Sequence, residues 1–183
     1  VSQRTPLARG FSLIETLVAL SVLIAIALGL GQLFVVATRA NDRARSMAFT
    51  AVLAAEQVDR LRSLSWGFDD AGVRVTDTET DLTVSPERTG GVGLTPSPDD
   101  ALERNLAGYC DFLDQSGRTI GNGGRPPLGT AYVRRWLLEP LAANPLDGLV
   151  IHVRVLTIES ASSNNRVAAG EGRMVSVRAR KAR

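Results

Sequence analysis

The chain has 183 residues, of which 44% are hydrophobic and 22% are charged, and its formal net charge at pH 7 is +2. This length suits one ordinary domain with an appendage and does not require a second hydrophobic core. The single cysteine, Cys110, excludes an intrachain disulfide and a cysteine-based metal cluster within these residues.

The charge is unevenly distributed, with residues 65–115 mainly acidic and residues 116–183 mainly basic. An acidic connecting region near a basic sheet in one domain is the simpler interpretation. The alternative is a basic surface for nucleic acid or lipid headgroups, centred on Arg173, Arg178, Arg180, Lys181 and Arg183. No aromatic residues lie among these charges, so stacking on bases is not supported and nucleic acid is not an expected partner.

From Thr16 to Thr38 the chain has 23 residues without a charge, and Arg39 follows directly. A helix of that length covers about 34 Å, which is enough to cross a hydrocarbon core of about 30 Å. A removable secretory signal is the competing interpretation, but such signals have apolar regions of only about 7–15 residues followed by a small-x-small cleavage site. Because Arg4 and Arg9 precede the segment, we expect residues 1–10 in the cytoplasm and the bulk of the chain outside.

Two glycines, Gly29 and Gly31, lie in the outer half of this segment. Each costs about 1 kcal/mol relative to alanine in a helix interior, so we expect a weak point where the helix bends or melts. Their spacing of two residues is not that of a GxxxG dimer face.

Beyond Arg39 the helical pattern continues to Leu64 as an amphipathic helix, which predicts one helix from about Phe11 to Leu64. One face consists mostly of small residues and is expected to pack against a sheet: Ala44, Met47, Ala48, Ala51, Ala55 and Val58. Phe49 and Leu53 lie on the opposite, polar face, where exposed apolar side chains point to a protein partner. Ordinary scattered surface hydrophobic residues are the alternative.

The stretch "GFSLIE", Gly10 to Glu15, follows a short basic leader and precedes the apolar run. It resembles the signal of type IV prepilins and type II secretion pseudopilins over about residues 4–64. The resemblance implies cleavage between Gly10 and Phe11 by a prepilin peptidase and N-methylation of Phe11. It also implies insertion in the inner membrane, a periplasmic C-terminal domain, and later packing into a filament with other pilins or pseudopilins.

The chain departs from the pattern of many major pilins in two ways. The membrane segment has no proline, and one cysteine does not allow the C-terminal disulfide that major pilins often have. The sequence therefore looks most like the minor pilins called pilus modification proteins or the I-type pseudopilin.

Residues 65–183, called the head below, are expected to form a β-rich domain with a long loop at 66–104. A hairpin is predicted over Tyr109–Ile120, and further strands within 130–140, 148–160 and 172–182. Alternating polar and apolar residues in the last two favour an antiparallel sheet covered on one side by the alanine-rich helix face. We therefore predict an α+β, pilin-like fold, divided into a leader (1–10), a membrane and assembly helix (11–38), its amphipathic half (39–64) and the head.

Candidate chemistry is sparse, and we predict no enzyme activity, no cofactor and no metal site. Asp77, Glu79 and Asp81 alternate like the first ligands of a calcium loop, but the glycine and distal glutamate of an EF-hand are missing. His152 lies within a predicted strand without a Ser, Cys or acidic residue nearby in the sequence, which favours a structural role.

Three classes of function follow from these features. A structural pilin-like subunit is the leading hypothesis, as part of a type IV pilus or of a type II secretion pseudopilus. A minor pilin that binds DNA or a surface through the basic C-terminal region is the second, and a membrane-tethered enzyme is the third. In a filament, Glu15 would enter an apolar core, where pairing with the Phe11 amine of a neighbour would offset a cost of a few kcal/mol and set the register.

Overall fold

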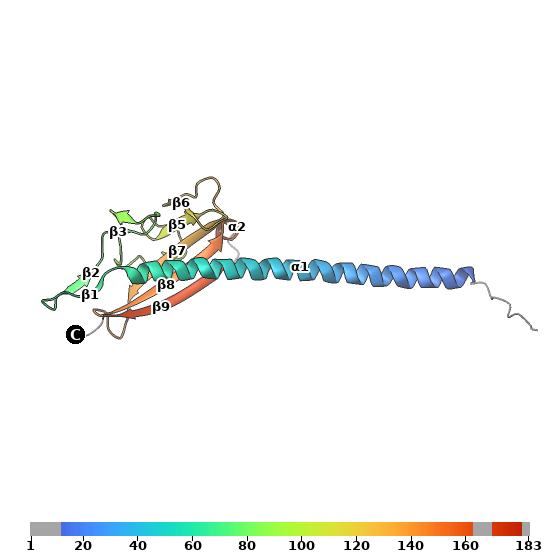
Figure 1. Cartoon of the computed structure of the whole chain (residues 1–183), viewed down its shortest axis with the longest axis horizontal. Helices are drawn as coiled ribbons and strands as arrows, with labels where there is room; N and C mark the ends of the chain where they lie inside the picture. The colour runs from blue at the N-terminus through green and yellow to red at the C-terminus, as the bar shows by residue number, and fades with distance from the viewer. Residues whose placement is uncertain (1–11, 163–169, 181–183) are drawn as a thin grey trace, which may run out of the picture. The chain divides into compact units, whose positions relative to one another are not determined.

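The structure is a computed structural model that describes residues 12–162 and 170–180 (Figure 1). The predicted leader, the cleavage residues Gly10 and Phe11, and the basic residues Lys181 and Arg183 lie outside these ranges. The contacts divide the chain into two compact units, one up to Asp42 and one from Arg43 onward.

One long helix, α1, spans Leu13–Ser63 and has 51 residues. It passes through Gly29 and Gly31 without a break, and its boundaries lie close to the predicted ones. The described residues up to Arg45 are all exposed, and the buried residues of α1 lie in its second half: Thr50, Leu53, Ala54, Gln57, Val58 and Leu61.

The main sheet of the second unit has five antiparallel strands in the order β6-β5-β7-β8-β9. In chain order these strands are β5 (Cys110–Leu113), β6 (Thr119–Asn122), β7 (Tyr132–Pro140), β8 (Gly148–Thr157) and β9 (Gly172–Ala179). A short helix, α2 (Ile158–Ser162), follows β8. The predicted α+β class, with a long N-terminal helix and a C-terminal antiparallel sheet, is confirmed.

The region predicted as a long loop contains two small hairpins. The strands β1 (Trp66–Phe68) and β2 (Arg74–Thr76) form the first, and β3 (Thr80–Asp81) and β4 (Arg88–Thr89) form the second. Strands of two or three residues carry too few residues for a periodic signal, so the sequence pattern predicted a long loop here.

The core lies between the second half of α1 and one face of the sheet. Leu53, Val58 and Leu61 pack in one cluster with inward residues of β7 and β8: Trp136, Leu138, Leu149, Ile151, Val153 and Val155. Trp136 is completely buried and anchors the sheet in this core. The second half of α1 therefore has its own apolar partner within the protein.

Two glycines allow α1 to approach the sheet closely. A Cβ atom at Gly172, the first residue of β9, would lie 2.5 Å from the backbone carbon of Thr50. Gly117, in the β5–β6 turn, has a positive φ of 84°, and a Cβ there would lie 2.8 Å from Leu53 Cδ2. These two glycines, together with the fully buried Ala54 of α1, make room for this contact.

The predicted orientation of the amphipathic half of α1 is wrong. Of the small residues expected to face the sheet, Met47 is 48% exposed, Ala44, Ala48 and Ala51 are also exposed, and only Val58 is buried. Leu53, which was expected on the outer face, is 3% exposed. The physical reason is that this half has two apolar stripes, and burial of leucines removes more apolar area from water than burial of alanines.

Phe49 and Leu53 therefore do not form an exposed partner surface. Leu53 belongs to the core, and Phe49 is half-buried against Tyr132, with 5.4 Å between the ring centroids. The predicted assembly role of these two side chains rested on exposure, and it is not retained.

The orientation of β9 also differs from the alternating pattern. Ile151, Val153 and Val155 of β8 are buried as expected, but Val175 and Val177 of β9 are 53% and 56% exposed. The intervening residues of β9 are half-buried, and one of them, Arg178, reaches the backbone of α1. The polar side of this edge strand, rather than its valine side, thus faces the helix.

Candidate functional site: the exposed half of α1

The first half of α1 is long and apolar enough to cross a membrane. None of its described side chains is buried, and large residues such as Leu13, Leu33 and Phe34 are 70–81% exposed. Contiguous apolar surface on this scale marks a surface that another apolar phase or another protein covers. The prediction of a membrane-spanning segment is therefore supported at the level of length and composition.

Three hydroxyl side chains of this half are hydrogen-bonded within the helix. The hydroxyls of Thr16, Ser21 and Thr38 donate to the carbonyls of Leu13, Leu17 and Phe34, at 2.8, 2.7 and 2.9 Å. Such back-bonding leaves no hydroxyl donor in need of water. These three side chains therefore meet the requirement that polar groups in hydrocarbon be paired internally.

Glu15 is the only charged residue among the described residues before Arg39, and it lies in the first turn of α1. The backbone N–H groups of Glu15 and Thr16 donate to the carbonyl of Ser12, at 3.0 and 3.2 Å. Ser12 and Glu15 have the spacing of a capping box, and a carboxylate in the first turn is favoured by the helix dipole. The helix start thus gives Glu15 a local role in addition to the one predicted for it.

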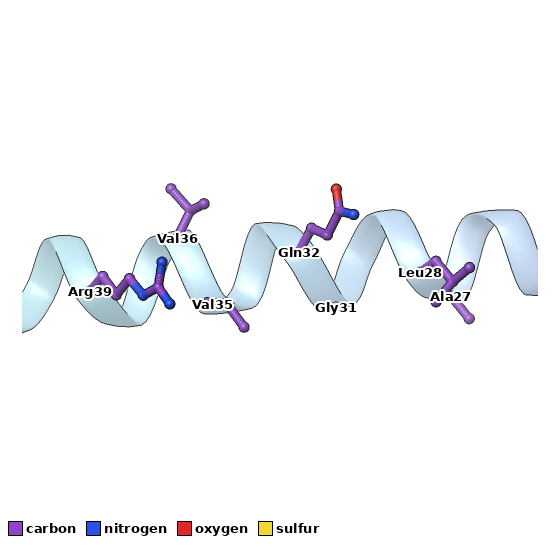
Figure 2. Close-up of a pocket in the computed structure, with 7 residues that line it drawn as sticks. All are labelled: Ala27, Leu28, Gly31, Gln32, Val35, Val36 and Arg39. Atoms are coloured by element: carbon purple, nitrogen blue, oxygen red, sulfur yellow. The ribbon is translucent and has the colours of Figure 1, made fainter.

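A shallow hollow of about 530 Å³ lies along one side of α1 (Figure 2). It is lined by Ala27, Leu28, Gly31, Gln32, Val35, Val36 and Arg39. A Cβ atom at Gly31 would meet nothing within 4 Å, so the missing side chain deepens the hollow. Figure 2 shows Gln32 and Val36 projecting on the same side of the helix. A hollow on one exposed helix can accept a lipid chain or a side chain of a neighbouring protein. The predicted bending or melting of the helix at Gly29 and Gly31 stays a prediction.

The basic C-terminal region is engaged in internal contacts. Arg178 donates to the carbonyls of Leu61 and Leu64, at 3.2 and 2.8 Å, and thereby caps the C-terminal end of α1. Burial lowers the pKa of this guanidinium. Arg173 lies 3.5 Å from the carboxylate of Glu171. The arginines proposed for a nucleic-acid surface thus have structural partners where the structure describes them.

The remaining candidates do not assemble into a reactive site. His152 lies 3.0 Å from Glu139 on the neighbouring strand, a partner that the sequence pattern did not reveal. Asp77 accepts hydrogen bonds from the backbone of Glu79 and Thr80, so it is used in a turn. Within 12–162 and 170–180, no three His, Cys, Asp or Glu side chains are grouped to hold a metal ion. Burial raises the pKa of the Cys110 thiol to about 12.

Sequence reasoning also missed a buried ion pair in the head. Arg134 Nε and Nη2 donate to the two oxygens of Asp111, at 3.0 and 2.6 Å, and both side chains are at most 1% exposed. Arg134 Nη1 also donates to the carbonyl of Leu53 in α1, at 3.3 Å. The sequence signal that could have revealed the pair is Asp111, a lone acidic residue within an apolar strand.

Comparisons with family models, with curated proteins and with solved structures find no match for this chain. The apolar N-terminal helix, whose second half packs on an antiparallel sheet, is compatible with a pilin-like shape.

Proposed function

We propose that this protein is a minor pilin-like structural subunit. In this proposal it is inserted in the inner membrane, cleaved between Gly10 and Phe11, N-methylated at Phe11 and assembled into a type IV pilus. The observation that carries the proposal is the continuity of α1 from a fully exposed apolar half into a half that anchors the head. In this proposal, α1 alone connects the part of the chain in the membrane or filament to the head.

The exposed apolar surface requires two successive environments in this proposal. Before assembly the bilayer covers the first half of α1, and after assembly the helices of neighbouring subunits replace the lipid. The second half of α1 also leaves Met47 and Val52 48% and 62% exposed, beside the small side chains of Ala48 and Ala51. Small residues let helices approach closely, so this stripe fits contact with another helix.

In the proposal, Glu15 determines the register in which neighbouring subunits pack. Transfer of a carboxylate to membrane-like depth costs a few kcal/mol unless a positive group pairs with it. The amine that cleavage before Phe11 creates is a suitable partner when it comes from a neighbouring subunit. Any other register leaves the carboxylate unpaired, so the same charge that permits assembly also disfavours incorrect packing.

A pseudopilin of a type II secretion system is the second candidate, because the same helix and the same carboxylate would serve a secretion pseudopilus. A strain that lacks the gene separates the two: loss of surface pili and pilus-dependent motility supports the pilus, whereas retention of exoproteins in the periplasm supports secretion. DNA binding is disfavoured, because Arg178 already donates hydrogen bonds to the carbonyls of Leu61 and Leu64 at the end of α1.

The mature N-terminus tests the proposal directly. Mass spectrometry of the chain produced with an active prepilin peptidase should show an N-terminal N-methylated Phe11. An intact leader, or cleavage at another bond, would overturn the proposal.

Replacement of the Glu15 carboxylate tests whether this group is needed for assembly into the filament. Glu15→Ala should leave cleavage largely intact but reduce methylation or recovery in sheared filaments at least about tenfold, since an unpaired amine then enters the core. The matched control is Glu56→Ala, which removes an exposed carboxylate from the second half of the same helix. Normal incorporation of Glu15→Ala, or equal loss in both variants, would contradict the assigned role.

A further inference from the structure

A second pocket is lined in part by Trp66, Arg74 and Thr76 of the β1–β2 hairpin. Figure 1 shows this hairpin directly after the C-terminal end of α1. Its volume is about 300 Å³, at the lower end for small-molecule sites. Its lining comes from separate parts of the head: the first hairpin with Thr78, residues within 94–96 and 140–149, and Arg180. None of the roles discussed above uses this pocket.

The walls of this pocket are largely apolar. They include the indole of Trp66, the side chains of Leu94 and Leu149, and three prolines at 96, 140 and 145. Prolines and an indole form a rigid surface, so little side-chain entropy is lost when a ligand is bound. The pocket therefore has the character of a preformed site for one apolar group.

Trp66 also has an unused hydrogen-bond donor. Its indole N–H is buried and has no partner among the residues that the structure describes. A buried donor without a partner costs about 1–3 kcal/mol, which a ligand oxygen would recover. The Arg180 guanidinium lies over the ring of the same indole, 3.6 Å from the ring centroid.

The rim of the pocket carries an excess of positive charge. Arg74 binds Asp147 through Nε and Nη2, at 2.7 and 3.2 Å, and Arg180 Nε lies 3.7 Å from the same carboxylate. Arg180 also donates to the carbonyls of Leu146 and Gly67. Arg74 is less constrained: its side chain is 47% exposed, and within the described ranges its Nη1 has no hydrogen-bond partner.

We propose that this pocket binds the C-terminal apolar residue of a partner polypeptide. The apolar side chain would lie between Trp66 and the prolines, and the terminal carboxylate would accept hydrogen bonds from Arg74. An apolar side chain directly beside a free carboxylate is the chemistry of a chain terminus, and it matches both the walls and the rim. The inference does not depend on cleavage, methylation or filament assembly.

The experiment uses the full chain in phosphatidylcholine nanodiscs, labelled with 5-fluorotryptophan. The chain has two tryptophans, so ¹⁹F NMR gives one resonance for Trp66 and one for the buried Trp136, and Trp66→Phe assigns them. The probe is N-acetyl-L-phenylalanine, and its amide is the control ligand. The Trp66 resonance should shift saturably with the acid while that of Trp136 stays, and the amide should bind at least about tenfold more weakly.

Variants and peptides make the test specific. Arg74→Gln should remove the preference for the acid, whereas the control Arg88→Gln, at another exposed arginine of the head, should retain it. Asp147→Asn should strengthen binding of the acid, because it releases Arg74, and this gain does not depend on the folding of the first variant. A pentapeptide that ends in phenylalanine should bind at least as tightly as the probe. No shift of Trp66, equal binding of acid and amide, or equal binding of a peptide with an internal phenylalanine would overturn the proposal.

Discussion

In the first half of α1 every described side chain is exposed, whereas in the second half six side chains are buried against the sheet. The two halves belong to one continuous helix, yet different groups donate hydrogen bonds to the backbone carbonyls of each half. In the first half, hydroxyls bond to the carbonyls of their own helix, as in Ser21 to Leu17. In the second, arginines of the sheet reach carbonyls of the helix, as in Arg134 to Leu53. An apolar helix surface thus needs a membrane or another protein to cover it, unless the protein's own sheet packs against it.

The largest expected effect comes from the ion pair that supports the second half. Asp111→Ala leaves the buried Arg134 without its partner and should lower the free energy of unfolding of the head by about 3–5 kcal/mol. Denaturant unfolding followed by tryptophan fluorescence measures this loss. Asp99→Ala, at an exposed position of the head, is the control and should change stability by less than about 0.5 kcal/mol. Equal effects in both variants would contradict the structural role of the pair.

Neighbouring residues of α1 offer a direct test of which face is buried. Leu53→Ala should cost about 2–5 kcal/mol, because it leaves a cavity in the core. Val52→Ala, one residue earlier and 62% exposed, should cost less than about 0.5 kcal/mol. The same unfolding measurement compares them, and a reversed order would contradict the burial of the Leu53 side of α1.

The cap at the end of α1 should have an intermediate effect. Arg178→Ala removes charged hydrogen bonds to the carbonyls of Leu61 and Leu64 and should cost about 1.5–3 kcal/mol. Hydrogen exchange should become faster first in the last turn of α1. Arg173→Ala, at the exposed arginine five residues earlier in β9, is the matched control and should leave that exchange unchanged.

The smallest expected effect is a pH dependence of the stability that Asp114, in the β5–β6 turn, gives to the fold. Hydrogen bonds from the hydroxyl of Ser116 and the backbone of Arg118 hold the pKa of Asp114 below its ordinary value. This carboxylate therefore stabilises the fold above the unfolded-state pKa of about 3.9, and the contribution is lost as the pH falls through the lower folded-state pKa.

Asp114→Asn tests this sign. The difference in melting temperature between the wild-type chain and the variant should be largest near neutral pH and should shrink below about pH 4. Burial raises the pKa of Asp111, which acts in the opposite direction, but that group is present in both proteins and cancels in the comparison. A difference that is independent of pH would contradict the role of the Asp114 charge.

The pattern of the chain was sufficient to locate most regular elements. Strand-like runs and a glycine-containing turn predicted the positions of β5 to β9, and clear alternation supported only the last two, β8 and β9. The uncharged run from Thr16 to Thr38 predicted the exposed apolar half of α1. The buried pair of Asp111 and Arg134 was not predicted, since it joins two strands whose register the local pattern does not contain.

Sequence by itself determined that this protein has a long apolar helix with one carboxylate near its start, followed by an antiparallel sheet. Those features depend on local periodicity and composition, which each segment carries alone. Only the tertiary structure decided which stripe of α1 is buried and which side of β9 faces it. The choice depends on Gly172 admitting the backbone of Thr50 and on Arg178 reaching the carbonyls of Leu61 and Leu64, contacts between residues more than a hundred positions apart.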